Sequence, residues 1–323
     1  MHRLIYILLL LSATFARAQQ FGTEWMTSPS PSDASCQWFR RTFVSPAADA
    51  RPLRASVCVA TNSRFILYVN GRNVSTSLYM PNRGQGDRRT IAITIDVTRF
   101  LRPDSNTVAV LACPSAIADP SPAPPTYAPP RMSVGFSGHT EGRRPFSYSS
   151  VDGWLCHAAS TSFTADGELM DGRSDALFPA YGDMVLAQWK PAVAVPVPNE
   201  AAPVDLGMSA ESIFGYTPRG CNILADNNVY VHSTLSPCYF DIDGNAVTYD
   251  FSPGFYGMVR VTLRGCRRGE RIRIGANLTY ICSGDIDEQA FCRFYPQYAR
   301  KITISGDNWF RPEQVQSVEA LGI

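Results

Sequence analysis

The chain has 323 residues, of which 45% are hydrophobic and 18% are charged, and its formal net charge is +1. This length is enough for two domains that each bury a core. Because the charge is nearly balanced, neither nucleic acid nor an anionic membrane surface is expected as the main partner. The sequence carries no phosphate-binding loop and no dinucleotide fingerprint, so we predict no cofactor.

The first 20 residues have the pattern of a secretory signal. Arg3 supplies a positive start, residues 5–11 form the apolar stretch, and residues 16–18 read Ala-Arg-Ala, a small-x-small cleavage site. We therefore expect a signal peptide over residues 1–18, cleaved near Ala18, and an exported protein that is periplasmic or secreted. The apolar stretch is too short to span a bilayer and no later segment approaches that length, so we predict no membrane insertion.

A β-hairpin is the clearest local pattern. The apolar run Phe-Ile-Leu-Tyr-Val over residues 65–69 is followed by Asn70-Gly71. This pair best tolerates the positive φ angles of a type I′ turn. Residues 96–103 then form a capped turn that leads into another strand over residues 107–111. Together these patterns indicate a β-sandwich.

Most of the remaining chain is also strand-like, and turn residues recur at the spacing of sandwiches rather than of βαβ folds. Long helical patterns are absent, although residues 315–321 fit either a helix begun at Pro312 or a final strand. We predict an all-β protein of two antiparallel β-sandwich domains, jelly-roll or galactose-binding-like. The further predicted strands cover residues 37–44, 91–95, 132–136, 255–263, 271–274 and 302–304.

Two proline-rich segments divide the chain, at residues 114–130 and 191–203. Strand-like sequence resumes directly after the first, which therefore lies inside a domain. Both segments lack periodicity and read as loop or linker, and the second is the better domain boundary because it leaves two units that are each large enough for a core. The predicted organisation is a first sandwich over residues 22–190, a linker over 191–204 and a second sandwich over 205–323.

The chain has nine cysteines, and an odd number leaves at least one thiol unpaired within the chain. Their spacings are irregular, and some, such as Cys58 between Val57 and Val59, stand where a small core residue would. We predict that most are buried thiols, with a disulfide framework as the alternative. Few histidines remain after signal removal, so we expect no Cys/His zinc site and predict no metal.

In order along the chain from about Trp25, these segments resemble the N-terminal β-rich half of bacterial α-L-rhamnosidases. Residues 67–71 resemble the family's hairpin, and residues 249–260 resemble the start of its second sandwich. The sequence departs from the family at Ser252-Pro253, where the family has glycine, and in the loop over residues 79–87, which lacks the usual aromatic pattern. The other matching segments are residues 37–43, 96–98, 106–110, 152–154, 167–173 and 189–192.

The resemblance implies non-catalytic sandwiches. In the family, a helical (α/α)6 barrel follows them and supplies a glutamate general acid and a second carboxylate that activates water. Neither carboxylate can be matched to this chain, so we predict no catalytic residue. We expect an accessory protein that binds or presents rhamnose-containing oligo- or polysaccharide, with a catalytic glycoside hydrolase domain or subunit as a further partner. Two alternatives stay open: a truncated α-L-rhamnosidase whose barrel is missing or encoded downstream, and a structural scaffold that docks a partner enzyme.

Sugars are recognised by aromatic faces flanked by planar hydrogen-bonding groups. The loop over residues 79–87 offers such a set, and Tyr127 in the first proline-rich segment adds another ring. The alternative is that these residues pack against a neighbouring domain. The predicted carbohydrate-binding residues are Tyr79, Asn82, Arg83, Asp87 and Tyr127.

Acidic residues suggest two other kinds of site. The cluster Asp285, Asp287 and Glu288 could form a catalytic dyad, but a solvated loop is the preferred interpretation, as it is for Glu168, Asp171 and Asp175. Residues 241–245 begin like a calcium loop, yet the sequence lacks the expected glycine and glutamate further along. A hairpin turn is the preferred interpretation there.

Overall fold

The computed structural model describes residues 24–29, 34–45, 47–74, 77–82, 90–117, 126–174, 188–196, 205–206 and 229–323. Within these residues the regular structure is strand, with three short 3-10 helices and no α-helix. The all-β sandwich class is therefore confirmed. No helix in the described part of the chain is long and apolar enough to cross a membrane. The predicted signal peptide lies outside the described residues.

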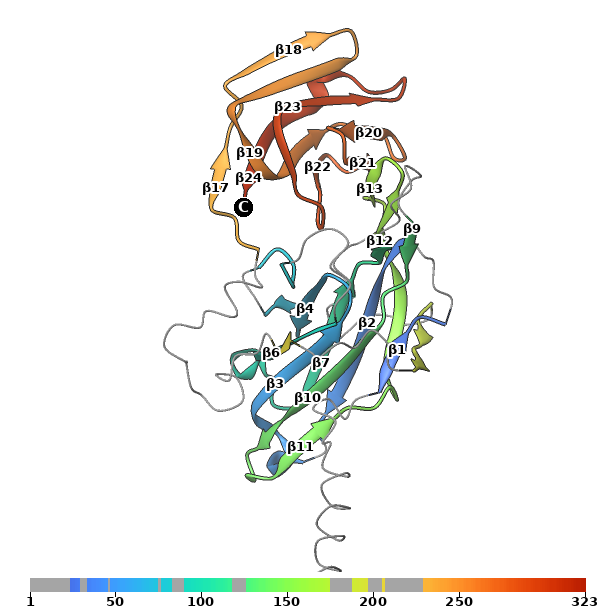
Figure 1. Ribbon diagram of the computed structural model, residues 1–323, viewed down its shortest axis with the longest axis vertical. Helices are drawn as coiled ribbons and strands as arrows, with labels where there is room; N and C mark the ends of the chain where they lie inside the picture. The colour runs from blue at the N-terminus through green and yellow to red at the C-terminus, as the bar shows by residue number, and fades with distance from the viewer. Residues whose placement is uncertain are drawn as a thin grey trace, which may run out of the picture.

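The first unit consists of two sheets that enclose a core (Figure 1). One sheet has the order β15-β1-β10-β3-β6-β16, with β11 paired to β10, and the other runs β13-β12-β2-β7-β4-β5, with β14 paired to β12. The first sheet comprises β1 (Trp25–Thr27), β3 (Pro52–Thr61), β6 (Ile91–Asp96), β10 (Met132–Thr140), β11 (Pro145–Tyr148), β15 (Val193–Val195) and β16 (Asp205–Leu206). The second comprises β2 (Ser35–Val44), β4 (Phe65–Val69), β5 (Arg72–Asn73), β7 (Ser105–Ala112), β12 (Leu155–Thr164), β13 (Gly167–Asp171) and β14 (Lys190–Pro191). A separate pair, β8 (Ser115–Ile117) and β9 (Thr126–Ala128), and the 3-10 helices η1 (Ala48–Ala50) and η2 (Thr98–Phe100) complete the unit.

Strand β4 is buried on both faces. Phe65, Leu67 and Val69 point into the core between the two sheets of the first unit. Ile66 and Tyr68 belong instead to a second core, which continues into the C-terminal unit. The unbroken apolar run of this strand therefore reflects burial on two sides rather than on one.

The turn after β4 is the one that the sequence predicts, since Asn70 and Gly71 have φ angles of 52° and 81°. The Asn70 side chain also binds the next predicted motif. Its Oδ1 accepts the Thr107 N–H at 2.9 Å, and its Nδ2 donates to the Phe100 carbonyl at 2.7 Å and to Asn106 Oδ1 at 2.9 Å. The hairpin and the capped turn are thus parts of one hydrogen-bonded corner.

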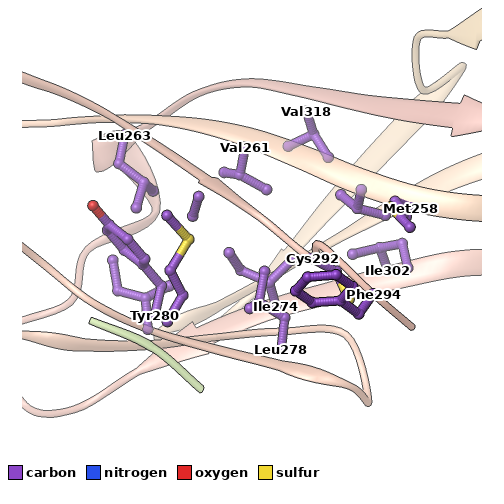
Figure 2. Close-up of a cluster of buried hydrophobic side chains, with 14 of the residues drawn as sticks. Met258, Val261, Leu263, Ile274, Leu278, Tyr280, Cys292, Phe294, Ile302 and Val318 are labelled. Atoms are coloured by element: carbon purple, nitrogen blue, oxygen red, sulfur yellow. The ribbon is translucent and has the colours of Figure 1, made fainter. Parts of the chain in front are cut away.

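The second unit is arranged around one long strand, β19 (Ala246–Arg264). Its first part pairs with β18 and β23, and its second part pairs with β22 and β24. Figure 2 shows Met258, Val261 and Leu263 of β19 facing Ile274 and Leu278 across the resulting core. The other strands are β17 (Ser233–Leu235), β18 (Tyr239–Asp243), β20 (Arg271–Ile274), β21 (Leu278–Ile281), β22 (Asp287–Phe291), β23 (Gln297–Gly306) and β24 (Val315–Gly322), the last of which follows the 3-10 helix η4 (Pro312–Gln314).

Residues 315–322 form strand β24, so of the two predicted alternatives, a helix and a strand, the strand is confirmed. Strand β24 alternates buried Val318 and Ala320 with more exposed residues and pairs with β19 over most of its length. Helix η4 supplies only the turn before it.

One sheet runs through both units because β13 of the first unit pairs in parallel with β21 of the second, with Glu168 opposite Leu278 and Asp171 opposite Ile281. Part of the segment that the sequence assigns to a linker also pairs within the first unit: β14 with β12, and β15 with β1. Strand β16, which the sequence assigns to the second domain, pairs with β6 of the first. Prolines flank these short pairings at the sheet edge, where a missing N–H is tolerated.

Candidate functional site

Tyr79 lies in the joint between the two units and is only 2% exposed. Its ring centroid is 6.0 Å from that of Phe294, and the guanidinium carbon of Arg64 lies 5.0 Å from the Tyr79 ring centroid. Burial raises the pKa of Tyr79 to about 12, against the opposing effect of the Arg64 charge. Tyr79 thus packs against the neighbouring unit, which was the alternative to sugar binding in the sequence analysis. A sugar could reach the Tyr79 ring only if the two units separated.

Tyr127 is half-buried and belongs to the same joint. It stacks on Phe163, with ring centroids 5.4 Å apart and planes inclined by 29°. Phe163 meets Tyr295 edge-on at 4.8 Å, and Arg64 lies 5.1 Å over Tyr295. Arg64 also donates a hydrogen bond of 2.5 Å to the Phe294 carbonyl. We call Arg64, Tyr79, Tyr127, Phe163, Phe294 and Tyr295 the aromatic joint.

The other predicted carbohydrate-binding residues are not in the aromatic joint. Asn82 is exposed and follows the buried Pro81. Arg83 and Asp87 lie outside the described residues. The structure thus brings together Tyr79 and Tyr127, and a sugar contact by the loop after Pro81 stays a prediction.

Glu168 connects the two units by hydrogen bonds. It belongs to β13 of the first unit, is 1% exposed, and its carboxylate accepts bonds from Cys292 Sγ at 3.0 Å, Arg293 N at 2.8 Å and Phe294 N at 3.1 Å. Burial raises the pKa of Glu168, and the hydrogen bonds together with the Arg293 charge counteract part of that rise. The expectation of a solvated loop was wrong for this residue, because strand pairing with β21 carries it into the interior.

The acidic cluster near the C-terminus divides into separate contacts. Glu288 is 4% exposed and accepts hydrogen bonds from Tyr280 Oη at 2.9 Å, Ser283 N at 2.6 Å and Gly284 N at 2.9 Å. Asp287 pairs with Arg264 at 2.6 Å, which lowers the pKa of the carboxyl. Asp285 accepts from Ser283 Oγ at 2.8 Å. The solvated-loop interpretation holds for the exposed Asp285. Asp287 is exposed but begins strand β22, and the interpretation is wrong for the buried Glu288, whose carboxylate caps a turn.

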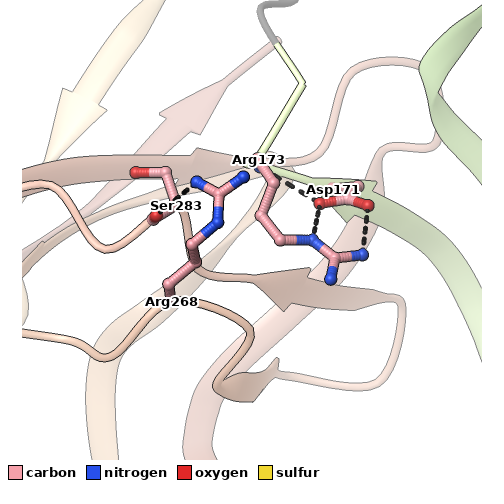
Figure 3. A network of polar contacts seen from close by, with 4 residues as sticks. All are labelled: Asp171, Arg173, Arg268 and Ser283. Atoms are coloured by element: carbon pink, nitrogen blue, oxygen red, sulfur yellow. Dashed lines mark hydrogen bonds and ion pairs between the residues drawn. The ribbon is translucent and has the colours of Figure 1, made fainter.

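Asp171 and Arg173 form a bidentate ion pair beside the seam between the units, and Figure 3 shows this pair next to Arg268 and Ser283. Arg173 Nε and Nη2 lie 2.8 and 2.7 Å from the two Asp171 oxygens, so the pKa of Asp171 is lowered. Arg268 donates to the Ser283 carbonyl at 3.1 Å. These contacts hold the end of β13 and the loop after β21 in place. Asp171 is the last residue of strand β13, so the expectation of a solvated loop was wrong for it as well. Asp175 lies outside the described residues.

The calcium-like segment is a hairpin turn. Asp243 pairs with Ala246, and Gly244 between them has a φ of 57°. Within the described part of the chain, no group of three or more His, Cys, Asp or Glu side chains is placed to hold a metal ion. The structure describes eight of the nine cysteines, and six of these eight are buried, as predicted.

Large exposed side chains gather on the second unit, which sequence reasoning did not single out. Tyr298 is 72% exposed, Trp309 49%, and Tyr239 and Phe240 of β18 are 64% and 56%. The β18–β19 hairpin stands at the end of the molecule away from the first unit (Figure 1). By contrast, Trp25, Trp38 and Trp154 are buried, with 5%, 1% and 2% exposure.

The fold and these contacts define a two-unit β-sandwich protein with a packed joint between the units. No protein-family model and no curated protein matches the chain. Its fold is similar to solved α-L-rhamnosidases from Dictyoglumus thermophilum (TM-score 0.72, 16% identity, 94% of this chain and 36% of that one) and Aspergillus terreus (0.70, 14%, 93% and 36%). The Streptomyces avermitilis enzyme in complex with L-rhamnose gives a TM-score of 0.66 at 16% identity over 91% of this chain and 29% of that one. The chain thus spans about a third of the length of these enzymes, and at such identities the likeness concerns the fold.

Proposed function

We propose that this chain is an exported carbohydrate-binding protein that binds or presents rhamnose-containing oligo- or polysaccharide. The observation that carries the proposal is the likeness of fold to three α-L-rhamnosidases over at least 91% of the chain. The ordered sequence segments that resemble the same family support it independently. The nearly neutral net charge suits a saccharide ligand better than a nucleic acid.

Binding is preferred to hydrolysis by this chain. Inverting glycosidases need two carboxyl groups on either side of the scissile bond, about 6.5–9.5 Å apart and free to exchange protons. Each member of the acidic cluster has a structural partner instead: Glu288 caps a turn, Asp287 pairs with Arg264, and Asp285 binds Ser283. The alternative is that the chain is the non-catalytic part of an α-L-rhamnosidase whose catalytic barrel is encoded with it.

A docking scaffold is the second candidate, and strand β18 favours it. All five of its residues are exposed, including Tyr239, Phe240 and Ile242. An exposed apolar edge of this kind suits a protein partner. A scaffold that binds no sugar would also keep the observed fold.

Calorimetric titration of the mature protein with rhamnose-containing oligosaccharides tests the proposal. We expect saturable heat at millimolar sugar or below, and we expect Arg83→Ala to weaken binding about tenfold, the loss of one charge-assisted hydrogen bond. Asp104→Asn, at an exposed position elsewhere on the first unit, is the matched control. Absence of heat with every rhamnose-containing sugar would contradict the binding function and favour the scaffold.

Two further measurements separate the alternatives. Release of aryl alcohol from an aryl rhamnoside by the purified chain would overturn the preference for binding over hydrolysis. Mass spectrometry of the exported protein would reveal whether residues 1–18 are removed, as the proposal requires.

A further inference from the structure

Trp309 is the most exposed of the five tryptophans of the chain, and it lies beside an arginine. Trp25, Trp38 and Trp154 are buried and Trp189 is partly buried, whereas 49% of Trp309 is exposed. The guanidinium carbon of Arg267 lies 5.7 Å from the Trp309 ring centroid. An exposed indole beside a planar cation is the combination that recognises a sugar ring carrying a charged or hydroxyl substituent.

Two hydrogen-bonded frames hold this pair in place. Glu270 is fully buried, and its Oε2 accepts from the Arg267 N–H at 2.8 Å and from Gln314 Nε2 at 3.2 Å. The same Gln314 side chain accepts the Arg311 N–H through Oε1 at 2.7 Å. The turn that carries Arg267 and the loop that carries Arg311 are therefore fixed to each other.

Asp307 forms the second frame. Its Oδ1 accepts the Trp309 N–H at 3.0 Å, and its Oδ2 accepts the Arg271 N–H at 3.0 Å. Both carboxylate oxygens are thus occupied by backbone donors. Because the surface is preorganised by these bonds, a ligand would lose little free energy in ordering it.

The surface carries three guanidinium groups beside the carboxylates of Glu270 and Asp307, which accept the backbone N–H groups of Arg267, Arg271 and Trp309. We call Arg267, Arg271, Trp309 and Arg311 the Trp309 patch. Among the residues that the structure describes, none of its three guanidinium groups forms an ion pair with a carboxylate, and Arg311 donates only to the carbonyls of Asn308 and Phe310. By contrast, Arg264 on the same unit is paired with Asp287. Unpaired arginines suit a carboxylate, which guanidinium binds with two parallel hydrogen bonds.

We propose that the Trp309 patch is a binding subsite for an acidic saccharide, a chain that contains uronic acid residues. The indole would cover the C–H face of a pyranose ring, and Arg267, with Arg271 and Arg311 nearby, would receive its carboxylates. This inference rests on the proposed carbohydrate-binding function and adds to it a second location and a charged class of ligand. The predicted loop after Tyr79 belongs to the other unit.

Titration with a trigalacturonic acid probe and with its methyl ester tests the subsite, because the ester keeps the sugar rings and removes the charge. We expect the acid to change tryptophan fluorescence and to bind about tenfold or more tightly than the ester, as for a charge-assisted hydrogen bond. Binding should weaken as salt increases, because exposed charges are screened. Polyglutamate is the control for a polyanion without sugar.

Variants locate the binding. Trp309→Ala should abolish the fluorescence change and weaken binding, and Arg267→Gln should lower affinity for the acid while leaving that for the ester unchanged. The matched controls are Arg264→Gln, at an arginine that is already paired, and Tyr148→Ala, at an exposed aromatic residue of the first unit. Both controls should bind as the wild type does.

The outcomes separate the two proposals. Equal affinity for acid and ester, wild-type binding by Trp309→Ala, or equally tight binding of polyglutamate would each overturn the acidic-saccharide subsite. If rhamnose oligosaccharides still bind in those cases, the proposed function stands without this subsite. If the acid binds through Trp309 and no rhamnose-containing sugar binds, the subsite stands and the rhamnose ligand is withdrawn.

Discussion

Glu168 is a carboxylate whose hydrogen-bond partners all come from the other unit of the molecule. It accepts hydrogen bonds from Cys292, Arg293 and Phe294 while being 1% exposed. Removing water from the carboxylate disfavours its charged form, and the three donors offset only part of that effect, so its pKa is raised from the ordinary 4.5. The protonation of this single side chain therefore affects how firmly the units are joined.

We expect Glu168→Gln to change how stability depends on pH. Because the folded pKa is raised, the folded state binds this proton more tightly than the unfolded chain does. The contribution is fully present below the unfolded pKa and is lost as pH rises through the folded pKa. The free energy of unfolding of the wild type, relative to Glu168→Gln, should therefore fall as pH increases above about 4.5. Urea denaturation of both proteins across that range measures it.

The control for this prediction is Glu313→Gln, which removes an exposed carboxylate. A wild-type advantage over Glu168→Gln that grows with pH would contradict the prediction, because it would mean that the donors outweigh desolvation.

Cys238 is the exposed thiol among the eight cysteines that the structure describes. Reactivity with a disulfide reagent requires an accessible thiolate, and burial raises the pKa of Cys36 and Cys292 well above the ordinary value. We expect Cys238→Ser to lower the number of fast-reacting thiols in the native protein by one, measured with Ellman's reagent. An unchanged number of fast thiols would show that Cys238 is protected in the folded protein.

At the scale of single residues, the sequence predicts those features that depend only on neighbouring residues in the chain. The positive φ angles of Asn70 and Gly71 follow from the preference of this pair for a type I′ turn. The burial of Tyr79 and Glu168 cannot be predicted in this way, because it depends on which surfaces meet when the second unit packs on the first. Trp309 was missed for the same reason, since no local pattern reveals that its ring is left uncovered.

Among the elements, strand β13 depends on a glycine at its start. Gly167 has a φ of 104°, and a Cβ placed there would lie 2.4 Å from the Asn277 carbonyl oxygen. The next residue, Glu168, donates its N–H to that same oxygen at 2.8 Å. The backbone at Gly167 and the backbone at Asn277 approach so closely, where β13 meets β21, that position 167 must lack a side chain.

We expect Gly167→Ala to lower the free energy of unfolding by more than the roughly 1–3 kcal/mol that an unfavourable φ alone costs. Gly265→Ala is the matched control, because Gly265 has a φ of 71° and no atom lies within 4 Å of the position that a Cβ would take there. Chemical denaturation of both variants measures the difference. An equal decrease in the free energy of unfolding in the two variants would contradict the prediction, because it would mean that the backbone near Asn277 moves aside without an energetic penalty.

The sequence predicts strands best where clear turn residues mark both ends of the strand. The hairpin after β4 and the turn at Gly244 are where the sequence places them. The sequence could not show that β14 and β15 pair with the first unit, because short segments between prolines have no periodicity and their pairing is decided by distant strands. It also could not show that β4 faces two cores, since an unbroken apolar run fits several environments.

At the scale of the whole molecule, the two units share a sheet and a core. Strands β13 and β21 continue one sheet across the seam, and the second core contains Tyr68 of the first unit together with Phe294 of the second. Independent domains usually meet through smaller and more polar contacts. The aromatic joint and the hydrogen bonds of Glu168 add to this shared sheet and core, so we expect the stabilities of the two units to be coupled.

We expect this coupling to produce one cooperative thermal transition, and Phe294→Ala to separate it into two. Phe294 has no exposed surface, and its removal from the joint should cost about 3–5 kcal/mol of unfolding free energy. Phe136→Ala is the matched control, because Phe136 is 2% exposed within the core of the first unit alone and should lower the melting temperature without dividing the transition. Differential scanning calorimetry distinguishes these outcomes through the ratio of calorimetric to van't Hoff enthalpy. Two thermal transitions in the wild type, or the same number of transitions in both variants, would contradict the prediction, because the contacts between the units would then not couple their unfolding.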